Sequence, residues 1–363
     1  MVATAKVNRY NNSSILSQEG RINMRIREAG EFGLIDTLAK KILPYSGRVV
    51  KGIGDDAAVM RQEPGRFLLM TTDMLVEDIH FSLKYFPLKA VGWKAVAVNV
   101  SDIAAMGGVP GFAAVSVSIP PDWEVEQIEE LYSGLIDCSK EYGIDIVGGD
   151  TVSSTKGLTV NVALTGYVEP DRVVYRSGAS PGDIIMVTGP LGSSAAGLHV
   201  LNKPLPEDMP GMKPGMNSEV ISAHLYPRAR LREGRILGGS GCISAMNDIS
   251  DGLVSEVLEI CRASSTGCEL YETALPFTEA VSAVAEGAGV SPSLWALYGG
   301  EDFELVFTVK PDCLDSVTSA LREAGAVPCE VGRIAEPGQG CLLVDTGGRR
   351  TEMKPRGYNH FRE

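Results

Sequence analysis

The chain has 363 residues, of which 44% are hydrophobic and 22% charged, and this composition excludes disordered and fibrous proteins while allowing two domains with a large buried core. The formal net charge of −13 disfavours binding to nucleic acid or to an anionic membrane through a basic surface. Because we recognise neither a membrane-spanning run of roughly 20 apolar residues nor a signal peptide, we expect a cytoplasmic protein.

The first half of the chain alternates predicted helices and strands. Residues 1–24 are polar and aperiodic, which predicts a flexible N-terminal extension. Apolar residues at helical spacing predict helices in 30–43, 93–108 and 126–143, of which the second is apolar on all sides and ends at Gly-Gly. Strands are predicted in 48–53, 66–73, 111–120, 145–150 and 158–168.

A polar segment containing Pro and Gly follows residue 168 and predicts a domain boundary. We therefore expect one domain at 25–168 and a second at 169–363. In the second, an α/β unit begins at 183–201, and the four prolines of 201–220 predict a loop. Further elements are predicted near 228–237, 245–265, 302–310, 315–325 and 341–346. This alternation favours a layered α/β or α+β fold.

The seven cysteines are scattered along the chain, and none forms a C-x-x-C pair. This spacing predicts neither a disulfide framework nor a zinc site, so we expect the cysteines to be small core residues.

Carboxylates repeatedly follow the small residues at the end of an apolar segment. They are Asp55 and Asp56, Asp73, Asp102, Asp150, Asp248 and Asp251, and Glu301 and Asp302. Each one alone can be a turn or cap residue. If the segment ends converge, however, the carboxylates cannot all stay ionised without cations. Abundant Asp and few His favour oxygen coordination of Mg²⁺, Mn²⁺ or Ca²⁺, and Mg²⁺ held by dispersed carboxylates usually accompanies a phosphorylated ligand.

Three further features allow two interpretations each. The stretch GPLGSSAAG, 189–197, is either a phosphate-binding loop or a closely packed turn, since it lacks the Lys of a Walker A motif. Arg176 either grips a phosphate or forms a surface ion pair. His80 is either a ligand-binding or a structural residue. No local motif suggests a Ser-His-Asp or Cys-His arrangement, so we do not expect covalent catalysis.

In their order along the chain, several motifs resemble the thiamine-monophosphate kinase family. They are GEFGLI, GIGDDAAV, TTDMLVEDIHF, KAVAVNVSDIAAMGGVP, VGGDT, YRSGASPGD, DISDGL, GGEDFEL and GYNHF. The superfamily also contains aminoimidazole ribonucleotide synthetase and selenophosphate synthetase. The resemblance extends from about Gly30 to Phe361, and TTDMLVEDIHF and GYNHF are its most specific parts.

The resemblance implies a two-domain fold of the aminoimidazole ribonucleotide synthetase type, with a homodimer formed through the N-terminal domains and an α/β C-terminal domain. It also implies ATP-dependent phosphorylation of thiamine monophosphate to thiamine diphosphate, assisted by several Mg²⁺ ions and without a general base. The implied metal ligands are Asp56, Thr71, Thr72, Asp73, Asp102, Asp150, Asp248 and Asp251. The implied ATP contacts are Gly149, Asp150, Arg176 and Ser250, and the implied substrate contacts are His80, Glu301 and Tyr358.

Two alternatives stay open at this point: another ATP-dependent synthetase of the superfamily, which activates an amide or selenide, or a non-catalytic protein that binds Mg-ATP. The adjacent aspartates carry a prediction of their own. Neighbouring side chains of an extended run point to opposite sides, so only one of Asp55 and Asp56 should face a shared metal site. The resemblance selects Asp56 and leaves Asp55 to brace the turn.

Overall fold

Two mixed β-sheets with helices packed against them make up the part of the chain that the computed structural model describes, residues 48–52, 54–61, 65–206 and 211–354. The extension 1–24, the helix predicted in 30–43 and Tyr358 lie outside these residues. Among the described helices, none is long and apolar enough to cross a membrane.

The first sheet has six strands in the order β1-β2-β3-β6-β4-β5. Its strands are β1 (Val49–Lys51), β2 (Ala58–Arg61), β3 (Phe67–Val76), β4 (Val109–Ile119), β5 (Asp145–Ser153) and β6 (Thr159–Val168). Neighbours are antiparallel except β4 and β5, which are parallel. A parallel pair needs a crossover, and α3 (Val125–Tyr142) provides it.

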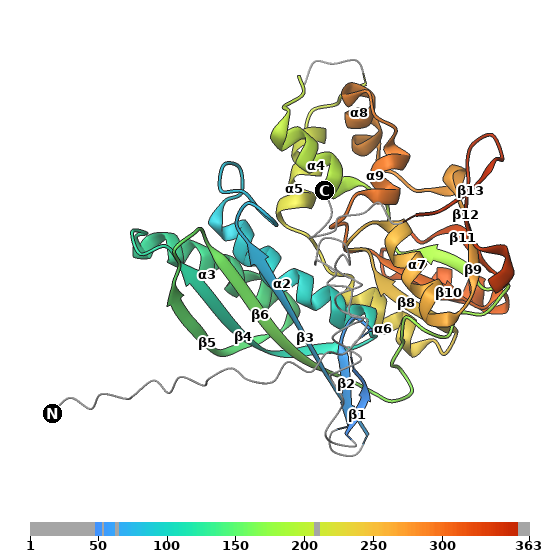
Figure 1. The fold of residues 1–363 in the computed structure, drawn as a ribbon, viewed down its shortest axis with the longest axis horizontal. Helices are drawn as coiled ribbons and strands as arrows, with labels where there is room; N and C mark the ends of the chain where they lie inside the picture. Colours follow the sequence, from blue (N-terminus) through green and yellow to red (C-terminus); the bar gives the residue numbers. More distant parts are fainter. Residues whose placement is uncertain (1–47, 53, 62–64, 207–210, 355–363) are drawn as a thin grey trace, which may run out of the picture. The chain divides into compact units, whose positions relative to one another are not determined.

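Helices α2 (Leu88–Ala105) and α3 cover one face of this sheet (Figure 1). Helix α2 also packs against α6 and β8 of the second half, which explains why it is buried on nearly every side. The opposite face of the sheet has exposed apolar side chains, among them Met70, Met74 and Phe112. Helix α2 therefore links the two sheets within one compact unit.

The second sheet has seven strands in the order β13-β12-β9-β11-β7-β10-β8. Its strands are β7 (Ile184–Val187), β8 (Ile243–Asp248), β9 (Gly267–Tyr271), β10 (Leu305–Val309), β11 (Cys329–Ala335), β12 (Cys341–Val344) and β13 (Arg350–Glu352). Only β12 and β9 pair in parallel among these strands.

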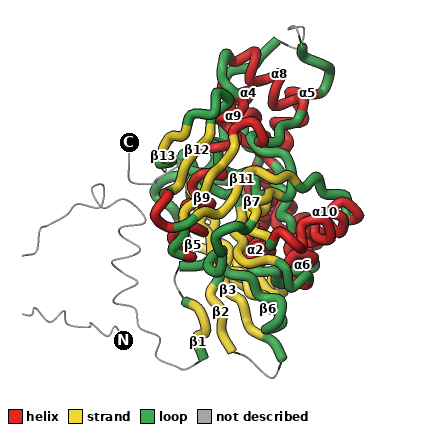
Figure 2. The backbone as a smooth tube through the Cα atoms, turned by 90° about the vertical axis from the view of Figure 1, so that its right-hand side faces the viewer, coloured by secondary structure: helices red, strands yellow, loops and turns green. Residues whose placement is uncertain are grey.

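Helices cover both faces of the second sheet, so its central strands β7 and β10 are buried throughout. The described helices of this half are α4 (Ser193–Asn202), α5 (Met216–Leu225), α6 (Leu231–Gly239), α7 (Leu253–Ser264), α8 (Glu279–Ala288), α9 (Pro292–Tyr298) and α10 (Leu314–Glu323). Among them, α4, α5 and α8 pack on one another and form a separate apolar cluster. Short 3₁₀ turns are η1 (Glu272–Ala274), η2 (Pro311–Cys313) and η3 (Pro337–Gln339). Helix α7 packs on one face, and α6 and α10 lie side by side on the other (Figure 2).

The structure bears out the layered α/β fold and corrects two expectations. The segment 201–220 is not a loop throughout, because α4 continues to Asn202 and α5 begins at Met216, after the last proline of the segment. The cysteines are not all isolated core residues either. Cys242 and Cys313 form a disulfide, and three others lie close together. Scattered spacing in the sequence concealed both arrangements.

Candidate active site

Three carboxylates from distant parts of the chain converge. Asp56 comes from the turn between β1 and β2, Asp102 from α2, and Asp248 from the end of β8. Each offers one oxygen, and these oxygens all lie within 4.8 Å of one another. Helix α2 brings them together, because it packs against both β3 and β8. We call Asp56, Asp102 and Asp248 the acidic cluster.

Side chains from the buried face of β3 and from α2 support the acidic cluster. The Thr71 hydroxyl donates a hydrogen bond to Asp102 Oδ2, and the Ser101 hydroxyl donates one to Asp248 Oδ2 at 2.6 Å. Asp73, two residues after Thr71 and so on the same face of β3, is in hydrogen-bond contact with Asp102. Five sequence-predicted residues therefore lie together: the cluster, Thr71 and Asp73.

The electrostatics of the acidic cluster favour a bound cation. Burial raises the pKa of Asp248 to about 8, with the neighbouring Asp56 adding to the shift. Burial, reinforced by Asp73 and Asp248, also raises the pKa of Asp102 well above its usual range. Asp56 Oδ2 is buried without a hydrogen-bond partner among the described residues. Oxygen donors of this kind are the ligands that Mg²⁺ prefers, so the residues fit that ion.

The raised pKa values predict how the stability of the metal-free protein depends on pH. In the unfolded chain Asp248 ionises with the ordinary aspartate pKa of 3.8, whereas in the fold its pKa is about 8. The folded state therefore binds more protons, and the free energy of unfolding should fall as the pH rises from about 4 to 8. Urea denaturation of the chelator-treated protein across this pH range measures the free energy of unfolding. A free energy of unfolding that rises over the same window would contradict these shifts.

Two other predicted ligands lie on the opposite face of the first sheet. Successive residues of a strand point to opposite faces, and Thr72 is exposed between Thr71 and Asp73. Asp150 is exposed on the edge strand β5, where it pairs in register with Ser116. Within one chain, neither belongs to the acidic cluster. Their roles as metal ligands stay predictions.

Close backbone packing accounts for Gly149, one of the predicted ATP contacts. A Cβ added at Gly149 would lie 1.6 Å from the carbonyl oxygen of Val115 on β4. Its φ of +157° also disfavours other residues. The glycine is thus required for β4 and β5 to pair, and its contact with ATP stays a prediction.

Asp55 and Asp56 diverge as expected. Asp55 Oδ1 accepts a hydrogen bond of 3.2 Å from the backbone N–H of Arg176, and its Oδ2 lies 3.3 Å from Lys51 Nζ. Asp55 therefore braces the turn, whereas Asp56 joins the acidic cluster.

Arg176 lies between acidic side chains rather than in a surface ion pair. Its guanidinium donates hydrogen bonds to Asp56 and lies 2.5 Å from Glu259 Oε2. It also donates to Asn247 Oδ1 at 3.1 Å. A phosphate contact is one of the two interpretations that the sequence allows for this arginine, and the geometry adds that its charge offsets that of Asp56.

The loop that carries Ser250 and Asp251 packs against the loop that carries Glu301. The backbone N–H of Glu301 donates to Ser250 O at 2.7 Å, which extends the pairing of β8 with β10 beyond the sheet. Glu256 on α7 holds the same loop, because its Oε1 accepts from the backbone N–H of Asp251 at 2.9 Å. Predicted ATP and substrate contacts therefore come from adjacent loops.

Lys94 connects two predicted substrate contacts, His80 and Glu301. Its Nζ donates to the backbone oxygen of His80 at 2.9 Å and lies 2.5 Å from Glu301 Oε1. Burial alone would raise the pKa of Glu301, but the charge and hydrogen bond of Lys94, together with smaller contributions from His224 and His80, offset it and the pKa is lowered. Glu301 adopts a left-handed φ of 67°, a costly conformation that is common at functional sites. The carboxylate is therefore ionised and held in place.

A cavity of about 290 Å³ lies beside Glu301, and Ser194 and Asp302 also line it. Asp302 resolves the interpretation of 189–197. Its carboxylate accepts hydrogen bonds from the backbone N–H groups of Gly192 at 2.7 Å and Ser194 at 3.2 Å, at the start of α4. Because a protein carboxylate already occupies these donors, the stretch is a packed turn in this structure.

Sequence reasoning missed Lys94, Glu256 and Glu259. A signal for Lys94 was present, since it is the one charged residue in the stretch 91–100 and is 1% exposed. A lysine within an apolar helix needs a buried partner. Glu256 and Glu259 look like ordinary polar positions of an amphipathic helix, so the sequence carried no signal for them.

Comparisons with known proteins cover most of the chain. Residues 54–168 match the family "AIR synthase related protein, N-terminal domain", and residues 180–344 match "AIR synthase related protein, C-terminal domain". The chain is 37% identical over 338 residues to the thiamine-monophosphate kinase of Bacillus subtilis (strain 168), which covers 92% of this chain and 99% of that relative. It is 34% identical over 334 residues to the thiamine-monophosphate kinase of Escherichia coli (strain K12), covering 92% and 98%.

A similar solved structure is "AaThiL complexed with AMPPCP and TMP". It has 35% sequence identity and a TM-score of 0.79, and the match covers 94% of this chain and 100% of that chain.

Proposed function

The chain belongs to the thiamine-monophosphate kinase family of AIR synthase-related proteins, and we propose that its acidic cluster serves the family's reaction by binding Mg²⁺. The enzyme uses ATP to phosphorylate thiamine monophosphate and forms thiamine diphosphate. The observation that carries the proposal is the convergence of Asp56, Asp102 and Asp248 within 4.8 Å.

The chemistry of the reaction explains why a carboxylate cluster is useful. The nucleophile is an oxygen of a phosphate monoester, whose second pKa is about 6, so it is largely ionised at neutral pH without a general base. The main barrier is the approach of two anionic phosphates in line. Mg²⁺ ions bound at the acidic cluster would supply the positive charge that offsets this repulsion. The protein's part is to hold the carboxylates in place through Thr71, Ser101 and Asp73.

We assign the ATP side of the site to Arg176 and to the loop that carries Ser250 and Asp251. Arg176 lies next to Asp56, and its planar guanidinium suits a phosphate. Asp251 lies three residues after Asp248, in the loop held by Glu256. These contacts support the assignment because they place a cation and a further carboxylate near the acidic cluster.

The substrate side is formed by His80, Glu301 and the cavity beside Glu301, and Tyr358 stays a predicted contact outside the described residues. The thiazolium ring of the substrate is a cation, and an ionised, fixed carboxylate complements it. The neighbouring His224 adds no charge at neutral pH, because burial lowers its pKa to about 4.

Replacing Glu301 by glutamine should raise the KM for thiamine monophosphate about 10-fold, because a charge-assisted contact is lost. The KM for ATP should stay within about a factor of two of the wild-type value, because the proposed ATP contact Ser250 lies in the neighbouring loop. Initial rates with each substrate varied in turn measure both constants. A change confined to ATP would reverse the assignment of the two loops.

We propose that the first sheet forms a homodimer through its exposed face. Phe112 is 57% exposed, Met74 53% and Met70 45%, which is unusual for large apolar side chains of one face. Thr72 and Asp150 lie on the same face, so a second copy seated there would enclose them. That position supports a role for both residues at the interface.

The Phe112→Glu variant should be monomeric, because it buries a charge in the proposed interface. Val125→Glu is the matched control, since Val125 is 70% exposed on α3, away from that face. Light scattering coupled to gel filtration should give twice the chain mass for the wild type and the control. A monomeric wild type would exclude the dimer.

The proposal also includes the domain boundaries and the cellular location expected from the sequence. We divide the chain into an N-terminal extension at 1–24, which lies outside the described residues, an N-terminal domain at 25–168 and a C-terminal domain at 169–363. The cytoplasmic location stays a prediction from the sequence.

The direct test combines the purified protein with ATP, Mg²⁺ and thiamine monophosphate. We expect one ADP for each thiamine diphosphate formed, and no product when Mg²⁺ is removed with a chelator. Product formation that is unaffected by removal of divalent cations would contradict the metal proposal without affecting the family assignment.

A further inference from the structure

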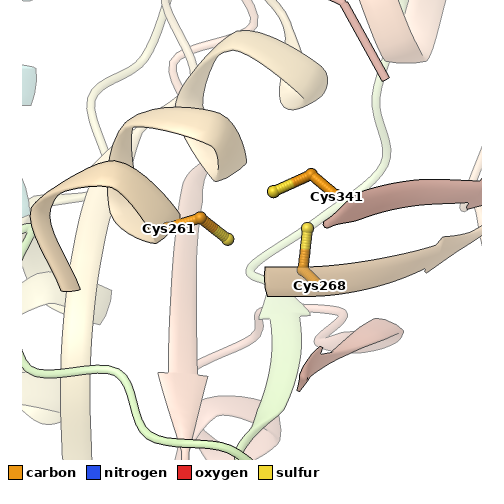
Figure 3. Close-up of side chains that lie close together, drawn as sticks. All are labelled: Cys261, Cys268 and Cys341. Carbon is orange, nitrogen blue, oxygen red and sulfur yellow. The ribbon is translucent and has the colours of Figure 1, made fainter. Parts of the chain in front are cut away.

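Three cysteine side chains converge outside the candidate active site. Cys261 lies near the end of α7, Cys268 on β9 and Cys341 at the start of β12. Figure 3 shows their sulfur atoms turned toward a common point, and the three atoms lie within 4.8 Å of one another. Cys261 and Cys268 are buried and Cys341 is half-buried. We call these residues the thiol cluster.

The backbone fixes the position of each thiol. Cys268 and Cys341 are directly paired on the parallel strands β9 and β12, so their side chains leave the sheet on the same face. The backbone N–H of Cys268 donates to Gly340 O at 3.0 Å. The tight turn between α7 and β9 returns the chain over Cys261, whose carbonyl accepts from the N–H of Thr266 at 3.0 Å.

We propose that the thiol cluster binds a thiophilic divalent cation, with Zn²⁺ as the biological candidate. Two thiolates bound to one zinc ion at about 2.3 Å lie about 3.8 Å apart. The three sulfur atoms lie within 4.8 Å of one another, so a small rotation of the side chains brings them to the spacing of zinc-bound thiolates. Sulfur ligands select a soft or borderline cation such as Zn²⁺ over Mg²⁺ or Ca²⁺.

Two features complete the site. Because Cys341 is half-buried, water can reach the fourth position of a tetrahedral ion. The buried hydroxyl of Thr266 lies next to the Cys261 thiol and has no other partner among the described residues, so it can donate a hydrogen bond to a thiolate. Binding releases the thiol protons and needs no oxidant or reductant.

The position of the thiol cluster indicates a structural role. A bound ion would connect α7 to the outer strands β9 and β12. Helix α7 also carries Glu256 and Glu259, which hold the Asp251 loop and Arg176. The ion would therefore stabilise the helix that supports the candidate active site, without taking part in phosphoryl transfer.

Cadmium is the probe for this site, because cadmium bound to thiolate gives an ultraviolet charge-transfer absorption that carboxylate-bound cadmium lacks. The chelator-treated full-length protein, mildly reduced so that the Cys242–Cys313 disulfide stays intact, is titrated with Cd²⁺. We expect the absorption to saturate at one equivalent and to be reversed by excess Zn²⁺. Absence of the absorption, or its saturation without competition by Zn²⁺, would overturn the proposal.

Matched variants separate the thiol cluster from other thiols. Zn²⁺ should raise the Tm of the wild type. Cys341→Ser changes the half-buried member of the thiol cluster and should lower the absorption and abolish this rise in Tm. Cys329→Ser, a half-buried free cysteine outside the cluster, should retain both. Circular dichroism checks that both variants fold. Thr266→Val provides a second test, because it keeps all three thiols and is expected to weaken Cd²⁺ binding. Equal absorption in Cys341→Ser and the wild type would contradict the assignment, as would a disulfide within the cluster that persists under reducing conditions.

Discussion

Replacing Asp102 by asparagine is expected to lower kcat by about 10²-fold or more, in the range seen when one preorganised electrostatic group is removed from an active site. The substitution takes one charge from the acidic cluster and leaves the side-chain shape unchanged, and the oxygen of asparagine can still accept the hydrogen bond from Thr71. Steady-state rates at saturating ATP and thiamine monophosphate measure the effect.

The fold of the Asp102→Asn variant should not be weakened. Burial and neighbouring carboxylates raise the pKa of Asp102, so the ionised group is unfavourable in the metal-free fold and its removal should not lower the free energy of unfolding. Asp137→Asn is the control, because Asp137 is 44% exposed in a surface ion pair with Lys89. Its kcat should equal that of the wild type. Full activity of Asp102→Asn would show that the acidic cluster is not the metal site.

Replacing Arg176 by alanine should lower the free energy of unfolding by about 3 to 5 kcal/mol, the usual effect of removing one partner from a buried ion pair. The arginine is 21% exposed and lies between Asp56 and Glu259. Its removal would leave Asp56 without this cation, whereas Glu259 would keep the neighbouring Arg262. Mg²⁺ should restore part of the loss, because it would offset the charge of Asp56. Urea denaturation with and without Mg²⁺ measures both effects.

One further variant tests whether the charge or the shape of Arg176 explains its effect on stability, and a second variant is the control. Arg176→Lys keeps the charge but loses the planar donor set, so its free energy of unfolding should lie between those of the wild type and Arg176→Ala. Arg349→Ala removes an arginine that is 78% exposed and should change the free energy of unfolding by no more than about 0.5 kcal/mol. If Arg176→Ala is as stable as the wild type, the arginine does not offset the acidic residues.

Local patterns predicted most of the regular elements and part of the candidate site. The helices α2 and α3 and the long strands of the first sheet follow from apolar spacing and glycine stops. The divergence of Asp55 and Asp56 follows from the alternation of side chains in extended chain. The same rule predicts that Thr72 faces away from Thr71 and Asp73, although the resemblance grouped all three.

Contacts between distant segments could not be predicted from local patterns. Which turn of α7 faces Arg176 depends on how the helix packs on the second sheet, so Glu256 and Glu259 resembled surface residues. The cysteines of the thiol cluster span 261–341, and only the parallel register of β9 and β12 brings Cys268 beside Cys341. The disulfide between Cys242 and Cys313 likewise depends on tertiary packing.

Anomalous diffraction from crystals grown with Mn²⁺ and a nonhydrolysable ATP analogue tests the central claim most directly. Mn²⁺ replaces Mg²⁺ at oxygen sites and is located by its own anomalous signal. We predict a peak within coordination distance of oxygens from Asp56, Asp102 and Asp248. Peaks elsewhere on the protein, with none at these three carboxylates, would contradict the account.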